Sequence, residues 1–168
     1  SWISSISASS TSPGTAYVSI DQHRLDDFAP YVFVTTDFGK SWRAISNGLT
    51  GYIHVVKEDP KEPNLIYAGS ELGIYASFDR GTTWTDLTSR FNLPGPRWVS
   101  RVVASRASAG AAYVVFDGHQ DDDFKPYIFK TTDFGATWSS ATGDMPDGMV
   151  VNALVEHHRN AKLLFAGT

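Results

Sequence analysis

The 168-residue sequence has no cysteine, which excludes disulfides and thiolate metal sites. No stretch approaches the ~20 apolar residues that a membrane helix needs, and we expect no membrane partner. No basic run is present and the net charge is -4, so a phosphate-binding surface and a nucleic-acid partner are not expected either. Because 42% of the residues are hydrophobic and only 19% are charged, the chain has the composition of a folded protein.

Helical periodicity is also missing, and an eight-residue pattern stands out instead. The pattern [Ser/Thr]-x-Asp-x-Gly-x-[Ser/Thr]-Trp occurs three times, at residues 35–42, 77–84 and 131–138. Each copy follows a short apolar run, which indicates a tight β-hairpin turn. In such a turn Asp accepts hydrogen bonds from backbone amides and Gly supplies the positive φ, while Trp packs the hairpin onto its neighbours.

A longer repeat contains these turns. Asp37 and Asp133 are 96 residues apart, and the same offset pairs Trp2 with Trp98 and His23 with His119. Each large unit holds two smaller ones, and each complete small unit has four runs rich in Val, Ile, Tyr, Phe and Thr, which predict strands. Repeats of this size with four strands are typical of β-propeller blades.

We therefore predict an all-β fold, a β-propeller of four-stranded antiparallel blades. The single segment 1–168 would contain blades at about 1–48, 49–92 and 93–146, and a half blade at 147–168. Since closed propellers usually have ~4–8 blades, three and a half blades predict a partial or open propeller. Its edge strands would need further blades or self-association. The chain starts without Met and ends within a predicted strand, so we expect a segment of a longer protein.

The three turns resemble the Asp-box, or BNR, repeats of sialidases, family 74 xyloglucanases and sortilin-type propellers. The phrase at residues 58–69, and Pro30-Tyr31 before the first turn, resemble bacterial sortilin-like or BNR-repeat glycosyl hydrolase proteins. The resemblance covers nearly the whole chain and implies an extracellular or periplasmic location. It is specific for the fold but not for an activity, because such propellers serve enzymes, receptors and assembly factors alike.

Sialidase-type active sites, by this resemblance, lie on the side of the disc opposite the Asp boxes. The boxes are therefore expected to be structural. The residues assigned this role are Asp37, Gly39, Trp42, Asp79, Gly81, Trp84, Asp133, Gly135 and Trp138.

The loops between the second and third strands of the first and third blades are the candidate binding loops. Each carries a His, an adjacent carboxylate pair, then Phe and Pro. Such a loop could contact a ligand or a hard cation, or hold a carboxyl group as a general acid. Repetition favours a structural loop, because one active site needs no duplicate. The candidate ligand residues are His23, Asp26, Asp27, His119, Asp122 and Asp123.

Known enzyme signatures are mostly missing, and no catalytic residue, metal site or cofactor is assigned. Glu71, in the short loop of the second blade, is a lone candidate acid on the side opposite the boxes. Trp2 and Trp98 begin the first strands of their blades, where they either pack in the core or stack on a sugar, and His157-His158 are expected to be solvated turn residues. We expect a non-catalytic binding or scaffolding segment with a carbohydrate or protein ligand. The alternative is a fragment of a glycoside hydrolase, xyloglucanase- or sialidase-like, whose active site is completed by missing blades.

Overall fold

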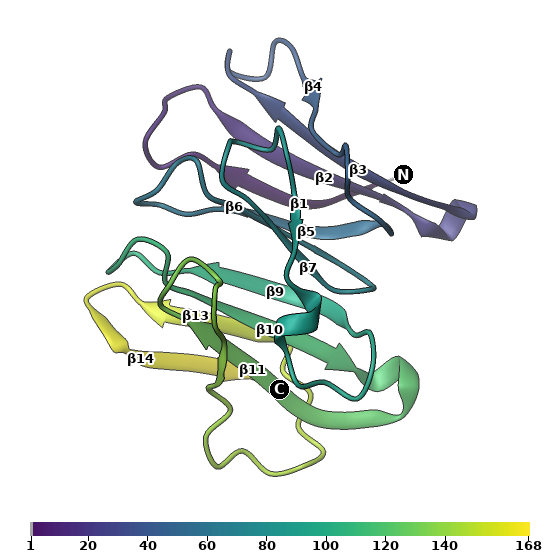
Figure 1. Cartoon of the computed structure of the whole chain (residues 1–168), viewed down its shortest axis with the longest axis vertical. Coiled ribbons are helices and arrows are strands. Elements are labelled where there is room, and N and C mark those ends of the chain that lie inside the picture. The colour runs from purple at the N-terminus through teal and green to yellow at the C-terminus, as the bar shows by residue number, and fades with distance from the viewer. Residues whose placement is uncertain (1) are drawn as a thin grey trace.

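The computed structural model describes residues 2–168, which form an all-β structure of three four-stranded antiparallel sheets followed by a two-stranded hairpin. Each sheet has its strands in chain order (Figure 1). The strands are β1 (Trp2–Ala8), β2 (Ala16–Gln22), β3 (Asp27–Thr35), β4 (Arg43–Ala44), β5 (Ile53–Glu58), β6 (Ile66–Ser70), β7 (Ile74–Ser77), β8 (Thr85–Asp86), β9 (Trp98–Ala104), β10 (Ala112–Gly118), β11 (Asp123–Thr131), β12 (Ser139–Ser140), β13 (Ala153–His157) and β14 (Asn160–Gly167). Short 3-10 turns cover His23–Leu25, Thr88–Arg90 and His119–Asp121.

The three four-stranded sheets follow one another from top to bottom in Figure 1. The C-terminal hairpin lies against the third sheet. The first strands of successive sheets are neighbours, with β1 against β5, β5 against β9, and β9 against β13. This is the arrangement of propeller blades, in which the first strand of each blade lies nearest the axis. No helix in the described part of the chain is long and apolar enough to cross a membrane.

The predicted strands differ from the structure in two ways. The last strand of each four-stranded sheet is only two residues long. The third strand of the first and third sheets is longer than predicted, since β3 begins at Asp27 and β11 at Asp123, inside the segments predicted as loops. Gln22 pairs with Asp27 after a break in register, so the predicted loop is a β-ribbon closed by a 3-10 turn.

The core consists of three clusters, one between each pair of neighbouring sheets. Tyr17 and Val32 of the first sheet pack with Val56 of the second. The second sheet packs its other face against the third, which in turn packs against the hairpin. Because both faces of the second sheet are covered, every residue of β6 and β7 is buried, and these strands lack the apolar-polar alternation of a half-exposed strand.

Each repeat turn is closed by the same carboxylate network. In the second turn, Asp79 Oδ1 accepts hydrogen bonds from the Ser77 hydroxyl and the Thr83 N–H, both at 2.8 Å. Its Oδ2 accepts from the Thr83 hydroxyl at 2.7 Å, and the Ser77 Oγ accepts from the Gly81 N–H at 2.7 Å. The equivalent bonds recur around Asp37 and Asp133.

These bonds affect the ionisation of the turn carboxylates. Hydrogen bonds from the hydroxyl and N–H of Ser41, Thr83 or Thr137 lower the pKa of Asp37, Asp79 and Asp133 to about 2. A carboxylate whose pKa is lower in the folded state stabilises folding above its unfolded pKa, near 4. That contribution is lost as the pH falls from about 4 toward 2.

The turns contain a second left-handed residue that the pattern does not predict. Gly81 has the expected positive φ of 83°, but the preceding Arg80 also has a φ of 59°. Phe38 and Phe134 occupy the same position in the other turns, with φ of 63° and 61°. Because such a conformation is unfavourable for residues with a side chain, the carboxylate network must compensate for it.

The Trp of each turn lies against the preceding sheet. Trp84 packs on the first core cluster, and its Nε1–H donates to the backbone carbonyl of Ile45 at 2.7 Å. Trp138 packs on the ring of Phe91, 4.9 Å between centroids. Within residues 2–168 no sheet precedes the first one, and Trp42 is accordingly 45% exposed.

The outer face of the first sheet is consequently an exposed apolar surface. A hollow of about 320 Å³ is lined by Ile3, Val18, Ile20, Phe33 and Trp42. At the other end of the molecule, the hairpin exposes Val155, Leu163 and Phe165. Exposed apolar surfaces of this kind mark sites of association.

We predict that the chain self-associates through the outer face of the first sheet. Replacing Ile3 with Lys should shift a concentration-dependent dimer or oligomer toward monomer, because it places a charge in the apolar contact. Sedimentation velocity measures the shift, and Leu25→Lys, at an exposed apolar residue of the first 3-10 turn, is the control. A wild-type chain that stays monomeric at high concentration would contradict the prediction.

Candidate functional site

The strand pairing assigns the connections to two faces of the molecule. Trp2 pairs with Asp21 at one end of the strands of the first sheet, where the loop from β2 to β3 lies. Ala16 pairs with Thr35 at the other end of the strands, where the first repeat turn begins. We call the side of the molecule at the first end the loop face, and the side at the other end the turn face. The candidate binding loops lie on the loop face, opposite the three repeat turns.

In the first candidate loop, Asp21 holds His23. Its Oδ1 accepts the backbone N–H of His23 at 2.9 Å and lies 2.6 Å from His23 Nδ1. Asp26 is exposed and left-handed, with a φ of 58°. Asp27 accepts the hydroxyl of Tyr31 at 2.8 Å and the N–H of Ala29 at 3.1 Å. The predicted Asp26-Asp27 pair therefore does not act as one group, because its members have different environments.

The second candidate loop repeats this geometry. His119 lies 2.7 Å from Asp117 through Nδ1, and Asp122 is left-handed with a φ of 57°. Asp123 accepts the Tyr127 hydroxyl at 2.7 Å and pairs with Arg97 at 3.1 Å. The hydrogen bond from Tyr127 is the main cause that lowers the pKa of Asp123, and Arg97 adds to it. Asp27 and Asp123 therefore use their carboxylates within the fold.

A cluster that the sequence does not predict lies beside the first loop. Asp21 is only 1% exposed, and its Oδ2 has no hydrogen-bond partner within residues 2–168. His54 Nδ1, on β5 of the next sheet, lies 4.0 Å from that oxygen and is likewise buried without a partner. Burial lowers the pKa of His54, although the charge of Asp21 opposes the shift.

Glu71 belongs to the same neighbourhood. It lies in the turn between β6 and β7. Its carboxylate packs so closely on Gly51 that a side chain at that position would collide with it. The Oε2 atom of Glu71 is buried without a partner within the described residues. Burial raises the pKa of Glu71, and the charge of Asp21 adds to the rise. Burial raises the pKa of Tyr52, and the charges of Glu71 and Asp21 raise it further.

Aromatic rings surround these polar groups. His23 stacks on Tyr52 at 4.7 Å and meets Trp2 edge-on at 5.4 Å. Trp98 meets His54 edge-on at 4.6 Å, and its own Nε1 is buried without a partner in the described chain. Trp2 is 37% exposed, so it lies at the edge of the site and not in the core. We call Asp21, His23, Tyr52, His54, Glu71 and Trp98 the mouth cluster.

The mouth cluster could not be recognised from sequence spacing. Asp21 ends β2, His54 lies within β5 and Glu71 follows β6, so they meet only because the first two sheets pack side by side. His23, Glu71 and Trp98 were separate candidates in the sequence, but nothing there indicated that they meet. The signal for Asp21 was the repetition of Asp-x-His at Asp21-Gln22-His23 and Asp117-Gly118-His119. Within residues 2–168 no three His, Asp or Glu residues are arranged to hold a metal ion.

No protein-family model matches the chain, and no curated protein matches it. Solved structures do. An ancestral GH74 enzyme superposes with a TM-score of 0.78 at 18% identity, over 98% of this chain and 21% of that one. The GH74 xyloglucanase from Xanthomonas campestris gives 0.69 at 15% identity, over 90% and 25% of the two chains. YCF48 from Cyanidioschyzon merolae gives 0.59 at 15% identity, over 92% and 46%.

The chain therefore spans between about a fifth and a half of the length of these structures. Identity this low establishes the fold but not an activity.

The mouth cluster predicts an unusual pH dependence. A carboxyl group whose pKa is raised by folding destabilises the protein once it ionises. Replacing Glu71 with Gln should therefore increase the free energy of unfolding relative to the wild type as the pH rises from 4 to 7. Urea unfolding at each pH measures the difference, with Glu62→Gln in the β5–β6 turn as the control. A difference that does not change with pH would contradict the assigned burial.

The sheet order and stacking, together with these structural matches, show that the chain is a segment of a β-propeller with about three and a half blades.

Proposed function

We propose that the chain is a non-catalytic binding segment of an Asp-box propeller and that the mouth cluster binds a carbohydrate. The repeated carboxylate network around Asp37, Asp79 and Asp133 supports the Asp-box assignment of the turns. The same network supports a structural role for these carboxylates, because their oxygens are occupied within the turn.

The observation that carries the binding proposal is the set of buried polar atoms without partners in the mouth cluster. These are Asp21 Oδ2, His54 Nδ1, Glu71 Oε2 and Trp98 Nε1. An unsatisfied buried polar group costs about 1–3 kcal/mol. Sugar hydroxyls both donate and accept, so they can satisfy the carboxylate oxygens as well as the indole N–H.

The aromatic residues support the same ligand class. Small-molecule sites combine apolar and aromatic walls with a few converging polar groups. Here Trp2 lies at the rim, while Tyr52 and Trp98 flank the polar atoms. His23 and His119, predicted as ligand residues, lie beside these rings. Asp26 and Asp122 are exposed on the same face, where they would contact an extended ligand.

Binding of soluble xyloglucan tests the proposal, since one structural neighbour is a xyloglucanase. Affinity electrophoresis should show retardation of the wild-type chain. Trp98→Phe keeps the ring but removes the buried N–H donor, and Asp21→Asn removes the buried charge. We expect each to weaken binding about tenfold, the value of one hydrogen bond to a desolvated site.

Trp42→Phe is the matched control, because Trp42 lies on the outer face of the first sheet and away from the cluster. Equal retardation of the Trp98 variant and the wild type, or no retardation at all, would contradict the proposal. Circular dichroism confirms that each variant is folded.

A fragment of a glycoside hydrolase is the second candidate. Its support is the raised pKa of Glu71 close to a second carboxylate, Asp21, since glycosidases use two carboxyl groups in different environments. Release of reducing ends from xyloglucan by a propeller that includes the remaining blades, abolished in Glu71→Gln, would favour this function over binding alone.

A further inference from the structure

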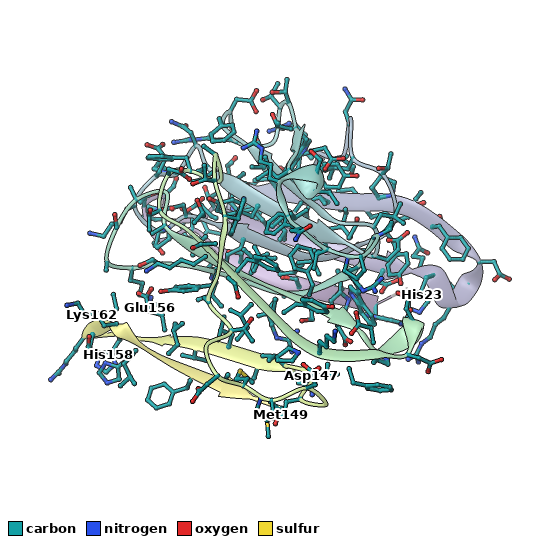
Figure 2. All side chains as sticks on the ribbon, turned by 60° about the horizontal axis from the view of Figure 1, so that its bottom comes forward. His23, Asp147, Met149, Glu156, His158 and Lys162 are labelled. Carbon is teal, nitrogen blue, oxygen red and sulfur yellow. The ribbon has the colours of Figure 1, made fainter. Side chains whose placement is uncertain are left out.

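A second site lies on the turn face, far from the mouth cluster. A groove of about 550 Å³ is lined by residues of β9, β13 and β14, and Lys57 of β5 lines it as well. Figure 2 shows Glu156 and His158 at the opposite end of the molecule from His23. The groove lining includes the charged or titratable side chains Lys57, Arg106, Glu156, His157 and His158.

Two cations of the groove have no anionic partner. Burial lowers the pKa of Lys57, and the charge of Arg106 lowers it further, whereas Glu58 opposes the shift. None of the ion pairs within residues 2–168 involves Lys57 or Arg106. Lys57 is half-buried and Arg106 is exposed. Like charges that face one groove are unfavourable, and an anion placed between them would relieve this cost.

Glu156 supplies the opposite charge in the same groove. Its Oε1 accepts the hydroxyl of Ser105 at 3.0 Å, while its Oε2 is buried without a partner among the described residues. This oxygen can only accept a hydrogen bond. A ligand that fills the groove therefore needs a donor group as well as an anionic group.

The junction between the first two sheets provides an internal comparison. There Glu58 accepts the hydroxyl of Ser9 at 2.7 Å, as Glu156 does from Ser105. Aligned on these equivalent bonds, the positions of Arg106, His157 and His158 are held in the first junction by Ser10, Asp59 and Pro60. The first junction does without basic or imidazole groups at these positions, so they are not required by the fold at the junction between the third sheet and the hairpin.

The imidazoles complete one wall of the groove. His157 Nδ1 accepts the backbone N–H of Arg159 at 3.2 Å, which leaves its Nε2–H as a donor. His158 stacks on His157 at 4.8 Å, and Phe165 lies 6.2 Å from the same ring. Val102 and Leu154 add apolar surface.

We propose that this groove binds a free amino acid with an apolar side chain. Its carboxylate would lie between Lys57 and Arg106, and its ammonium group would donate to Glu156 Oε2. The side chain would pack on Val102, Leu154 and Phe165. A zwitterion with an apolar body uses both cations, the buried carboxylate oxygen and the apolar wall together.

Isothermal titration calorimetry with three probes tests the proposal on the 168-residue chain. The probes are L-phenylalanine, 3-phenylpropanoate, which lacks the ammonium group, and phenethylamine, which lacks the carboxylate. L-Phenylalanine should bind at least about tenfold more tightly than either analogue, since each lost hydrogen bond to a charged group weakens binding by about this factor or more.

Two variants should then separate the two charges of the ligand. Arg106→Ser introduces the residue of the first junction. It should weaken the binding of L-phenylalanine and of 3-phenylpropanoate about tenfold and leave the affinity for phenethylamine unchanged. Glu156→Gln should weaken the binding of L-phenylalanine and of phenethylamine and leave the affinity for 3-phenylpropanoate unchanged. Lys162→Asn, which removes a charge from the same hairpin outside the groove, is the control and should change nothing.

Three outcomes would overturn the proposal. The first is no detectable binding of L-phenylalanine at millimolar concentration. The second is equal affinity for all three probes, which would show apolar contact without charge recognition. The third is an equal loss of affinity for L-phenylalanine in Arg106→Ser and Lys162→Asn, which would show a general effect of net charge. Xyloglucan binding at the mouth cluster is measured separately, so the two proposals fail independently.

Discussion

The contact between the indole of Trp84 and the first sheet is the interaction on which the stacking of the blades depends. The ring covers apolar residues of the preceding sheet, and its N–H satisfies the backbone carbonyl of Ile45. The carboxylate network of Asp79 fixes the turn that carries this Trp. One local motif thus closes a hairpin and also joins two sheets, which explains why it recurs with each complete blade. Within residues 2–168 no sheet packs on Trp42, and the outer face of the first sheet is exposed and apolar there.

Much of the fold could be predicted from sequence because its information is local. The Asp, Gly and Trp of each turn lie within six residues of one another, and short-range spacing shows such motifs directly. The early starts of β3 at Asp27 and of β11 at Asp123 were harder to predict, because charged residues near a Pro indicate a loop. Pairing with β2 and β10 overrides that local preference.

The candidate sites were harder to predict, for the opposite reason. The sequence directed attention to the adjacent carboxylates at Asp26-Asp27 and Asp122-Asp123, whose members have separate environments. It did not indicate Asp21 or His54, which meet only where two sheets pack together. Residues at the junctions of a repeat protein come from different blades, and no spacing rule within one blade brings them together. Comparison of equivalent junctions is more informative, as the change from Ser10 to Arg106 shows.

The most direct test of this account compares Trp84→Phe with Trp42→Phe by urea unfolding, at concentrations where the chain is monomeric. Trp84→Phe removes a buried hydrogen bond and packing surface, so its free energy of unfolding should fall by about 2–3 kcal/mol. Trp42→Phe changes an exposed ring and should cost less than about 0.5 kcal/mol. Equal losses in the two variants would contradict the claim that the turn Trp stabilises each blade through the sheet before it.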